Sequence, residues 1–127
     1  MLYAILCYDS EDVVHAWTKE QNDAVMGRLE AVTSRLAAQG RLGPVARLLP
    51  TTTATTVRKG AAPLVIDGPF AETKEQLLGF YVVDCEDLAQ AIEVAKELGQ
   101  ASGLAGAHEV RPLMLFNAGT AGSTVTP

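Results

Sequence analysis

Two carboxylates and a lysine near the middle of the chain are the residues most suited to acid–base chemistry. Asp67 opens an Asp-Gly-Pro turn, and Glu72 and Lys74 follow it. A carboxylate that is partly buried beside a cation is the usual source of a general acid or base. We therefore expect Asp67 and Glu72 to act as acid–base groups if they converge with Arg58 or Lys74 on a pocket. The structural alternative is that Asp67 caps a short helical turn over residues 71–76, and that Glu72 and Lys74 make local polar contacts.

Basic residues are concentrated in the stretch that precedes this turn. Residues 31–66 contain no acidic residue, although the 127-residue chain has a net charge of −5. A local positive field favours an anionic ligand, so Arg47, Arg58 and Lys74 are candidate ligand-binding residues. Hydroxyl groups nearby could orient such a ligand, and they belong to Thr53, Thr55 and Tyr81. The alternative is that the arginines form ion pairs with acidic residues of the flanking segments, which are weak on a surface.

Composition and motifs exclude several classes of function. The acidic net charge argues against a nucleic-acid-binding protein, which usually carries a basic face. No apolar run approaches the ~18 residues of a membrane span, and the N-terminus lacks the basic region of a signal peptide. We therefore expect a cytoplasmic protein. Glycine-rich phosphate-binding loops and the serine-hydrolase elbow are also missing, so no cofactor is expected.

The histidines and cysteines do not form a recognisable motif. His15 and His108 lie far apart in the sequence, and no metal-binding spacing is present, so no metal site is expected. His108 begins a predicted strand, where it could line a pocket or be a half-exposed strand end. Cys7 and Cys85 are expected to be buried thiols, with a redox pair as the alternative.

Hydrophobic spacing predicts two helices and six strands. The first helix begins at a capping box formed by Thr18 and Gln21 and ends at Gly40. The second helix begins near Leu88 and ends at Gly99. Residues 10–17 are predicted to be a connection, and residues 117–127 a loose tail after a single domain over residues 1–116. The strands are predicted at residues 2–8, 43–49, 51–58, 64–66, 78–84 and 108–116.

This order of elements predicts an α+β fold of the ferredoxin-like, split βαβ type. The chain reads β-α-β, then an inserted β-hairpin, then β-α-β. Two helices cover only one face of such a sheet, yet the strands contain apolar residues on both faces. A bare apolar sheet face needs a partner, and a second copy of the chain supplies one at least cost. We therefore expect a two-fold homodimer packed through this face.

The string Asp-Gly-Pro-Phe-Ala-Glu-Thr-Lys-Glu-Gln, at residues 67–76, resembles the signature of the DGPF group of YCII-related proteins. Flanking residues 53–58, 79–81 and 109–112 agree with it. The resemblance implies a dimeric α+β barrel and a group of small bacterial proteins whose biochemistry is largely unestablished. It also implies a His–Asp site with the histidine on the first helix, but the predicted helix at residues 19–39 contains no histidine. That pair therefore does not transfer to this chain.

Two functions follow as hypotheses. The first is a homodimeric protein that binds a small molecule, an anionic metabolite by its charge pattern, with a regulatory role. The alternative is a cofactor-independent enzyme that uses Asp67 and Glu72 as acid–base groups. In both cases we expect Asp67, Glu72 and Arg58 to border one concavity at the end of the sheet.

Overall fold

The computed structural model describes residues 1–122, in which four strands form one antiparallel sheet. β1 (Leu2–Asp9) lies beside β5 (Gln76–Asp84) in the centre, and β2 (Leu42–Arg47) and β6 (Ala107–Pro112) form the edges. The order β2-β5-β1-β6, with every neighbouring pair antiparallel, is that of a ferredoxin-like sheet built from two βαβ units. The predicted α+β, ferredoxin-like fold is confirmed.

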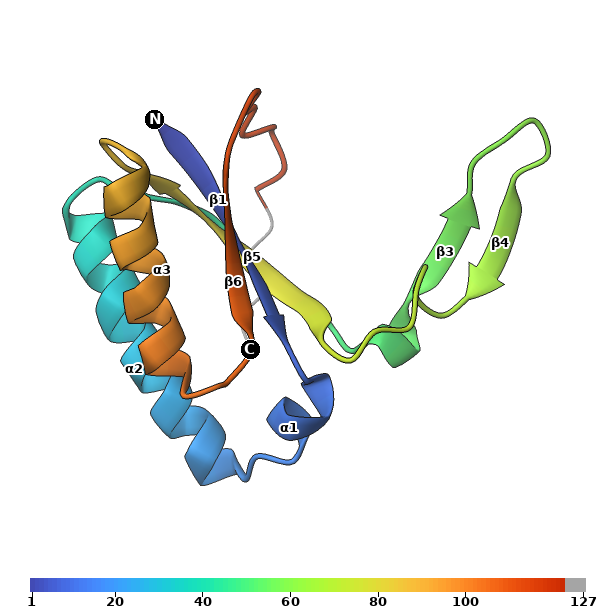
Figure 1. Cartoon of the computed structure of the whole chain (residues 1–127), viewed down its shortest axis with the longest axis horizontal. Helices are drawn as coiled ribbons and strands as arrows, with labels where there is room; N and C mark the ends of the chain where they lie inside the picture. Colours follow the sequence, from blue (N-terminus) through green and yellow to red (C-terminus); the bar gives the residue numbers. More distant parts are fainter. Residues whose placement is uncertain (123–127) are drawn as a thin grey trace.

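Two long helices, α2 (Lys19–Ala38) and α3 (Leu88–Ser102), cover one face of this sheet (Figure 1). α2 begins at the predicted capping box. The Gln21 amide donates to the Thr18 hydroxyl at 3.1 Å, and the Thr18 amide donates to the Gln21 side chain at 2.9 Å. The helix ends before Gly40, whose φ of 69° is the predicted left-handed stop.

The second long helix extends beyond its predicted end. α3 continues through Gly99 to Ser102, and Gly103, with a φ of 67°, supplies the left-handed residue. Ala101 is buried three residues after Leu98, so the apolar stripe continues for another turn. The prediction that Gly99 ends the helix was wrong because this burial outweighs the ~1 kcal/mol cost of a glycine inside a helix.

The core lies between the helices and the sheet. Side chains of β1 alternate between the two sheet faces, so that Tyr3 and Ile5 point toward the helices. The largest side chains with almost no exposure are Ile5, Leu36, Val83 and Leu98. No helix within residues 1–122 covers the opposite face of the sheet (Figure 1). On that face Leu2, Ala4 and Leu6 are only partly buried.

The segment between β2 and β5, residues 48–75, projects from the sheet as an arm (Figure 1). Its strands, β3 (Thr55–Arg58) and β4 (Leu64–Asp67), pair only with each other, as the predicted inserted hairpin requires. A short 3-10 helix, η1 (Thr51–Thr53), forms the root of the arm. The arm leaves the body on the side away from α2 and α3.

Both faces of the arm carry exposed apolar side chains. Val57 lies opposite Val65 on one face, and Ile66 lies on the other, with exposed fractions of 59%, 65% and 41%. An isolated two-stranded hairpin is at best marginally stable in water. The arm therefore presents apolar surface suited to a partner.

Three shorter segments complete the description. Residues 10–17 contain a short helix, α1 (Glu11–His15), within the predicted connection. Residues 71–75 form bends and irregular backbone and Gln76 begins β5, so the helical turn predicted over residues 71–76 is not formed. β6 ends at Pro112 rather than near Phe116. The Leu113 amide still donates to the Leu2 carbonyl at 3.0 Å, and after this hydrogen bond the chain leaves the sheet.

Residues 117–122 are exposed and form neither helix nor strand. The rest of the predicted tail, residues 123–127, lies outside the described residues. In residues 1–122 no helix has both the length and the apolar character needed to cross a bilayer.

Candidate functional site

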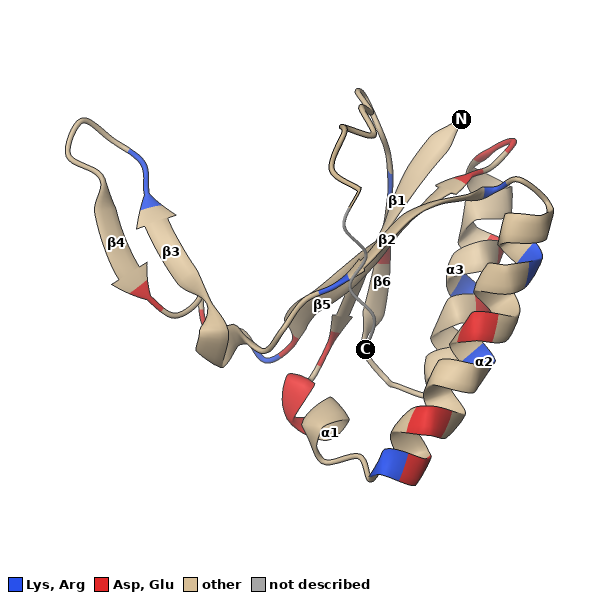
Figure 2. Cartoon of the chain, turned by 180° about the vertical axis from the view of Figure 1, so that it is seen from behind, with Lys and Arg blue, Asp and Glu red and all other residues tan. Residues whose placement is uncertain are grey.

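The structure separates Asp67 from Arg58. Asp67 ends β4 opposite Thr55 at the root of the arm, and its side chain is exposed. Arg58 lies at the far end of β3, about 10 Å further along the strand, with its guanidinium 5.2 Å from the ring centre of Phe70. Figure 2 shows the basic end of β3 and the acidic end of β4 at opposite ends of the hairpin. These two candidates therefore do not share a pocket.

Glu72 lies in a hollow of about 320 Å³ at the root of the arm. The hollow is lined by neither Asp67 nor Arg58, so it does not bring the three predicted residues together. Its other polar lining consists mainly of hydroxyl groups, those of Thr51, Thr52 and Thr73.

The remaining arm candidates are also spread out. Thr53 donates its hydroxyl hydrogen bond to the Pro50 carbonyl at 2.7 Å, and Lys74 is exposed. Thr55 lies beside Asp67 across the hairpin. The ligand-binding and acid–base roles of the arm residues stay predictions.

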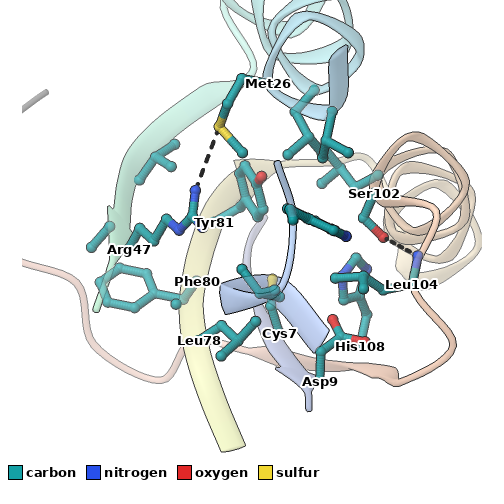
Figure 3. Close-up of a pocket in the computed structure, with 18 residues that line it drawn as sticks. Cys7, Asp9, Met26, Arg47, Leu78, Phe80, Tyr81, Ser102, Leu104 and His108 are labelled. Carbon is teal, nitrogen blue, oxygen red and sulfur yellow. Dashed lines mark hydrogen bonds between the residues drawn. The ribbon is translucent and has the colours of Figure 1, made fainter. Parts of the chain in front are cut away.

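A second cavity, of about 110 Å³, lies between the helices and the sheet and has a mostly apolar lining (Figure 3). One cross-strand row of the sheet contributes to its lining. The pairing register aligns one residue from each strand at the same level, in the order Arg47, Gly79, Cys7 and His108. Arg47 and Tyr81 are the two sequence candidates that the structure brings together here.

Gly79 lines the cavity where β2 and β5 approach each other most closely. Alternation along β5 places residue 79 on the same face as Tyr81, which points toward the helices. A Cβ at Gly79 would lie 2.2 Å from the Ala46 carbonyl oxygen and 3.0 Å from the Arg47 Cα. β2 therefore approaches β5 as closely as only glycine permits. A lone glycine inside a strand is the sequence signal that could have indicated this site.

Asp9 and His108 lie beside each other at one end of the cavity (Figure 3). Asp9 is only 5% exposed, and it accepts a hydrogen bond from the Gly106 amide at 2.8 Å. Burial raises the pKa of this carboxyl, and the Gly106 hydrogen bond and the nearby His108 only partly oppose that rise. A buried carboxyl with a raised pKa is suited to hold and release a proton.

His108 is held in one tautomer by its surroundings. Its Nδ1 atom lies 3.0 Å from the Ala95 carbonyl oxygen. Because a carbonyl only accepts hydrogen bonds, Nδ1 carries the proton in this contact, and the neutral ring keeps an unprotonated Nε2. Asp9 and His108 also line a hollow of about 300 Å³ on their other side. The pair is therefore reached from two directions.

Arg47 stands at the opposite end of the row from His108 (Figure 3). Its Nη1 atom lies 3.5 Å from the Met26 sulfur, which is a weak acceptor. No Asp or Glu of residues 1–122 forms a salt bridge with it. Of the other arginines in the basic stretch, Arg35 does pair, with Glu97. The ion-pairing alternative therefore holds for Arg35 and not for Arg47.

The Cys7 thiol and the Tyr81 phenol, which both line the cavity, stay neutral at physiological pH. Burial raises the pKa of Cys7 to about 12, and burial likewise raises the pKa of Tyr81 to about 12. Cys7 pairs with Gly79, whereas Cys85 follows the far end of β5 beside Met1. The two cysteines are therefore well separated. The described residues contain no group of three His, Cys, Asp or Glu side chains able to hold a metal ion.

Asp9 was not among the predicted site residues, although the alternation of β1 indicates it. Counting by twos from the buried Ile5 places Cys7 and Asp9 on the helix-covered face. His108 lines the cavity, which was one of the two alternatives left open by the sequence. Trp17, the single tryptophan of the chain, lines it as well.

We expect Asp9→Asn to stabilise the fold at neutral pH. A raised pKa means that the folded state binds more protons, so the free energy of unfolding falls as pH rises through the interval between the unfolded and folded pKa values. Each pKa unit of that shift costs about 1.4 kcal/mol. Asparagine keeps the oxygen that accepts from Gly106 and removes the charge.

Thermal unfolding of both proteins as a function of pH provides the measurement. The variant should melt above the wild type at pH 8, and the difference should shrink below the pKa of an unfolded aspartate. A difference in melting temperature that is constant across this pH range would show that ionisation of Asp9 does not destabilise the folded state.

Comparison with known sequences agrees with this architecture. A family model described as the YCII-related domain matches residues 1–117. The chain is also 53% identical over 120 residues to a protein of Rhizobium meliloti (strain 1021) called Uncharacterized protein R00369. That alignment covers 94% of this chain and 97% of the relative.

Proposed function

The chain belongs to the YCII-related domain family, and we propose that it binds a small organic anion in the cavity between its helices and its sheet. One observation carries this proposal. A mostly apolar cavity is lined at one end by Arg47, an exposed residue, and at the other by the Asp9–His108 pair. Such a cavity selects a molecule with an apolar body and one charged group.

The cavity favours a ligand the size of one ring or a short chain. Its volume of about 110 Å³ is of the order of the ~150 Å³ that accommodates benzene in an engineered cavity. Three strand spacings separate the Cα atoms of Arg47 and His108, about 14 Å. Because both side chains reach inward, the space that remains between them is short.

Arg47 is the proposed anion-binding group. Its side chain has a weak sulfur acceptor in place of a carboxylate, so a ligand carboxylate would gain charge-assisted hydrogen bonds without displacing an existing ion pair. Trp17 supplies a flat apolar surface to the same cavity.

Acid–base catalysis on the bound molecule is the second candidate function. The observation in its favour is the burial of Asp9 beside His108. The Asp9 carboxyl, whose pKa is raised by burial, and the His108 ring both line the cavity, so they form a pair able to exchange protons with a bound molecule. Asp67 and Glu72, the pair predicted from sequence, remain the competing acid–base candidates, although both are exposed.

Titration with benzoate tests the binding proposal. Benzoate combines one ring with one carboxylate, and Trp17, as the single tryptophan, reports its binding through fluorescence. We expect Arg47→Gln to weaken binding at least tenfold, since a hydrogen bond to a charged group contributes about 1.5–3 kcal/mol.

Two further variants make the result specific. Lys59→Gln removes one positive charge from the exposed arm and should leave the dissociation constant unchanged. Arg58→Gln distinguishes the two sites, because an effect there with none at Arg47 would place the anion on the arm. Benzamide, the neutral analogue, should bind more weakly than benzoate to the wild type. Equal affinity for both probes would contradict an anion site.

We further propose that the protein is a cytoplasmic homodimer of bacterial origin and that it belongs to the DGPF group. The signature string at residues 67–76 supports the group assignment. The uncovered sheet face and the apolar arm support the dimer. A second copy could cover both surfaces of each chain with a single two-fold interface.

A further inference from the structure

The short helix α1 connects the arm to the cavity. Its residue Val14 and the following Trp17 both line the cavity wall. Its first residue, Glu11, lies at the root of the arm. α1 is only five residues long, and its N-cap residue Ser10 makes no side-chain capping hydrogen bond. A helix this short does not hold its position alone, so contacts from elsewhere must fix it.

Glu11 supplies these contacts, and it binds the arm at both of its ends. At the beginning of the arm, the Thr51 amide donates to Glu11 Oε2 at 3.0 Å, and the Thr51 hydroxyl donates to Oε1. Where the arm rejoins the sheet, the Glu11 amide donates to Gln76 Oε1 at 3.0 Å. Gln76 in turn donates from Nε2 to the Thr73 carbonyl at 2.6 Å.

This arrangement gives the signature string a mechanical role. Gln76 is its last residue, and its side chain satisfies a backbone amide in the first turn of α1, which would otherwise lack a partner. The arm cannot change its angle to the body without disturbing Glu11. Movement of Glu11 moves the helix that carries Val14 and leads into Trp17.

We propose that Glu11 couples the arm to the cavity, so that docking of a second copy on the arm and binding of a small anion in the cavity strengthen each other. The inference rests on the proposed anion site and homodimer. By linkage the two effects are equal in size, whichever event comes first. The coupled element is α1, held between the arm root and the bound ligand.

The test compares Glu11→Ala with Asp12→Ala. Both variants remove one acidic side chain from the first turn of α1, but only Glu11 has side-chain hydrogen bonds to the arm. Benzoate is titrated by Trp17 fluorescence at protein concentrations below and above the dimer dissociation constant. If the dimer does not dissociate at nanomolar concentration, Ile66→Asp supplies the monomer.

For the wild type and Asp12→Ala we expect the benzoate dissociation constant of the dimer to be at least fivefold lower than that of the monomer. A factor of about five is the smallest coupling typical of allosteric proteins. For Glu11→Ala the difference between the two values should be at least halved, because only the backbone hydrogen bond to Gln76 remains. Thr51→Val removes one of the same hydrogen bonds from the arm side and should reduce the coupling in a folded protein even if the glutamate variant unfolds.

Equal benzoate affinity in wild-type monomer and dimer would overturn the coupling while leaving the anion site intact. Absence of benzoate binding by the wild type would overturn the proposed anion site. In that case the link between the arm and the cavity is tested by Trp17 emission of the ligand-free protein. Emission should shift when the wild-type dimer is diluted, and the shift should be smaller for Glu11→Ala. An unchanged wild-type emission, or a chain that is monomeric at every concentration, would refute the coupling.

Discussion

Replacement of Gly79 by alanine is expected to destabilise the protein by about 3 kcal/mol and to abolish benzoate binding. The added methyl group would lie 2.2 Å from the Ala46 carbonyl oxygen, so β2 must move away from β5. The obstacle is backbone, which cannot rotate aside as a flexible side chain does, and overpacking of this kind costs about 1–3 kcal/mol or more. Displacement of β2 also moves Arg47, which pairs with Gly79.

Gly27→Ala is the matched control for this substitution. Gly27 lies inside α2, and a Cβ there would meet nothing within 4 Å. Alanine should therefore stabilise the helix by about 0.5–1 kcal/mol. Chemical denaturation of both variants measures the two effects. If Gly79→Ala unfolded at the wild-type denaturant concentration and still bound benzoate, the close approach of β2 would not shape the cavity.

Light scattering of the wild-type protein should give twice the chain mass of 13.4 kDa. The second large effect is expected for Ile66→Asp, which should reduce the measured mass to that of one chain. Burial of an isoleucine contributes about 1.5–3 kcal/mol. In a two-fold dimer each copy loses that contribution, so the dissociation constant should rise more than a hundredfold.

Leu88→Asp provides the control for the dimer. Leu88 is 50% exposed, close to the 41% of Ile66, but it lies at the start of α3 on the body. An aspartate is well tolerated in the first turn of a helix, and this variant should remain a dimer. A wild-type protein of single-chain mass at micromolar concentration would remove the basis for a partner on the arm.

The elements of the fold could be predicted because their signals are local. Thr18 and Gln21 form the capping box of α2 within four residues of sequence, and the apolar spacing after it needs no knowledge of the rest of the chain. Alternation indicates β1 in the same way. The end of α3 was misplaced because burial of Ala101, which depends on the tertiary structure, decides whether the helix passes Gly99.

The cavity could not be predicted in the same way, because part of its lining depends on the register of four strands. Arg47, Gly79, Cys7 and His108 are far apart in sequence and meet only through pairings across β2, β5, β1 and β6. The sequence drew attention to Asp67 and Glu72 because they are close together along the chain. The hairpin then places them on a projecting arm, where closeness in sequence does not produce burial.

The direct pairing of β2 with β5 makes these two strands a hairpin whose loop is the whole arm. The entropy cost of closing a loop grows only slowly with its length, so residues 48–75 can lengthen, shorten or change composition without altering the register that forms the cavity. The body and the arm are thus free to diverge at different rates. One scaffold could therefore keep the same cavity residues while the arm changes to bind a different partner.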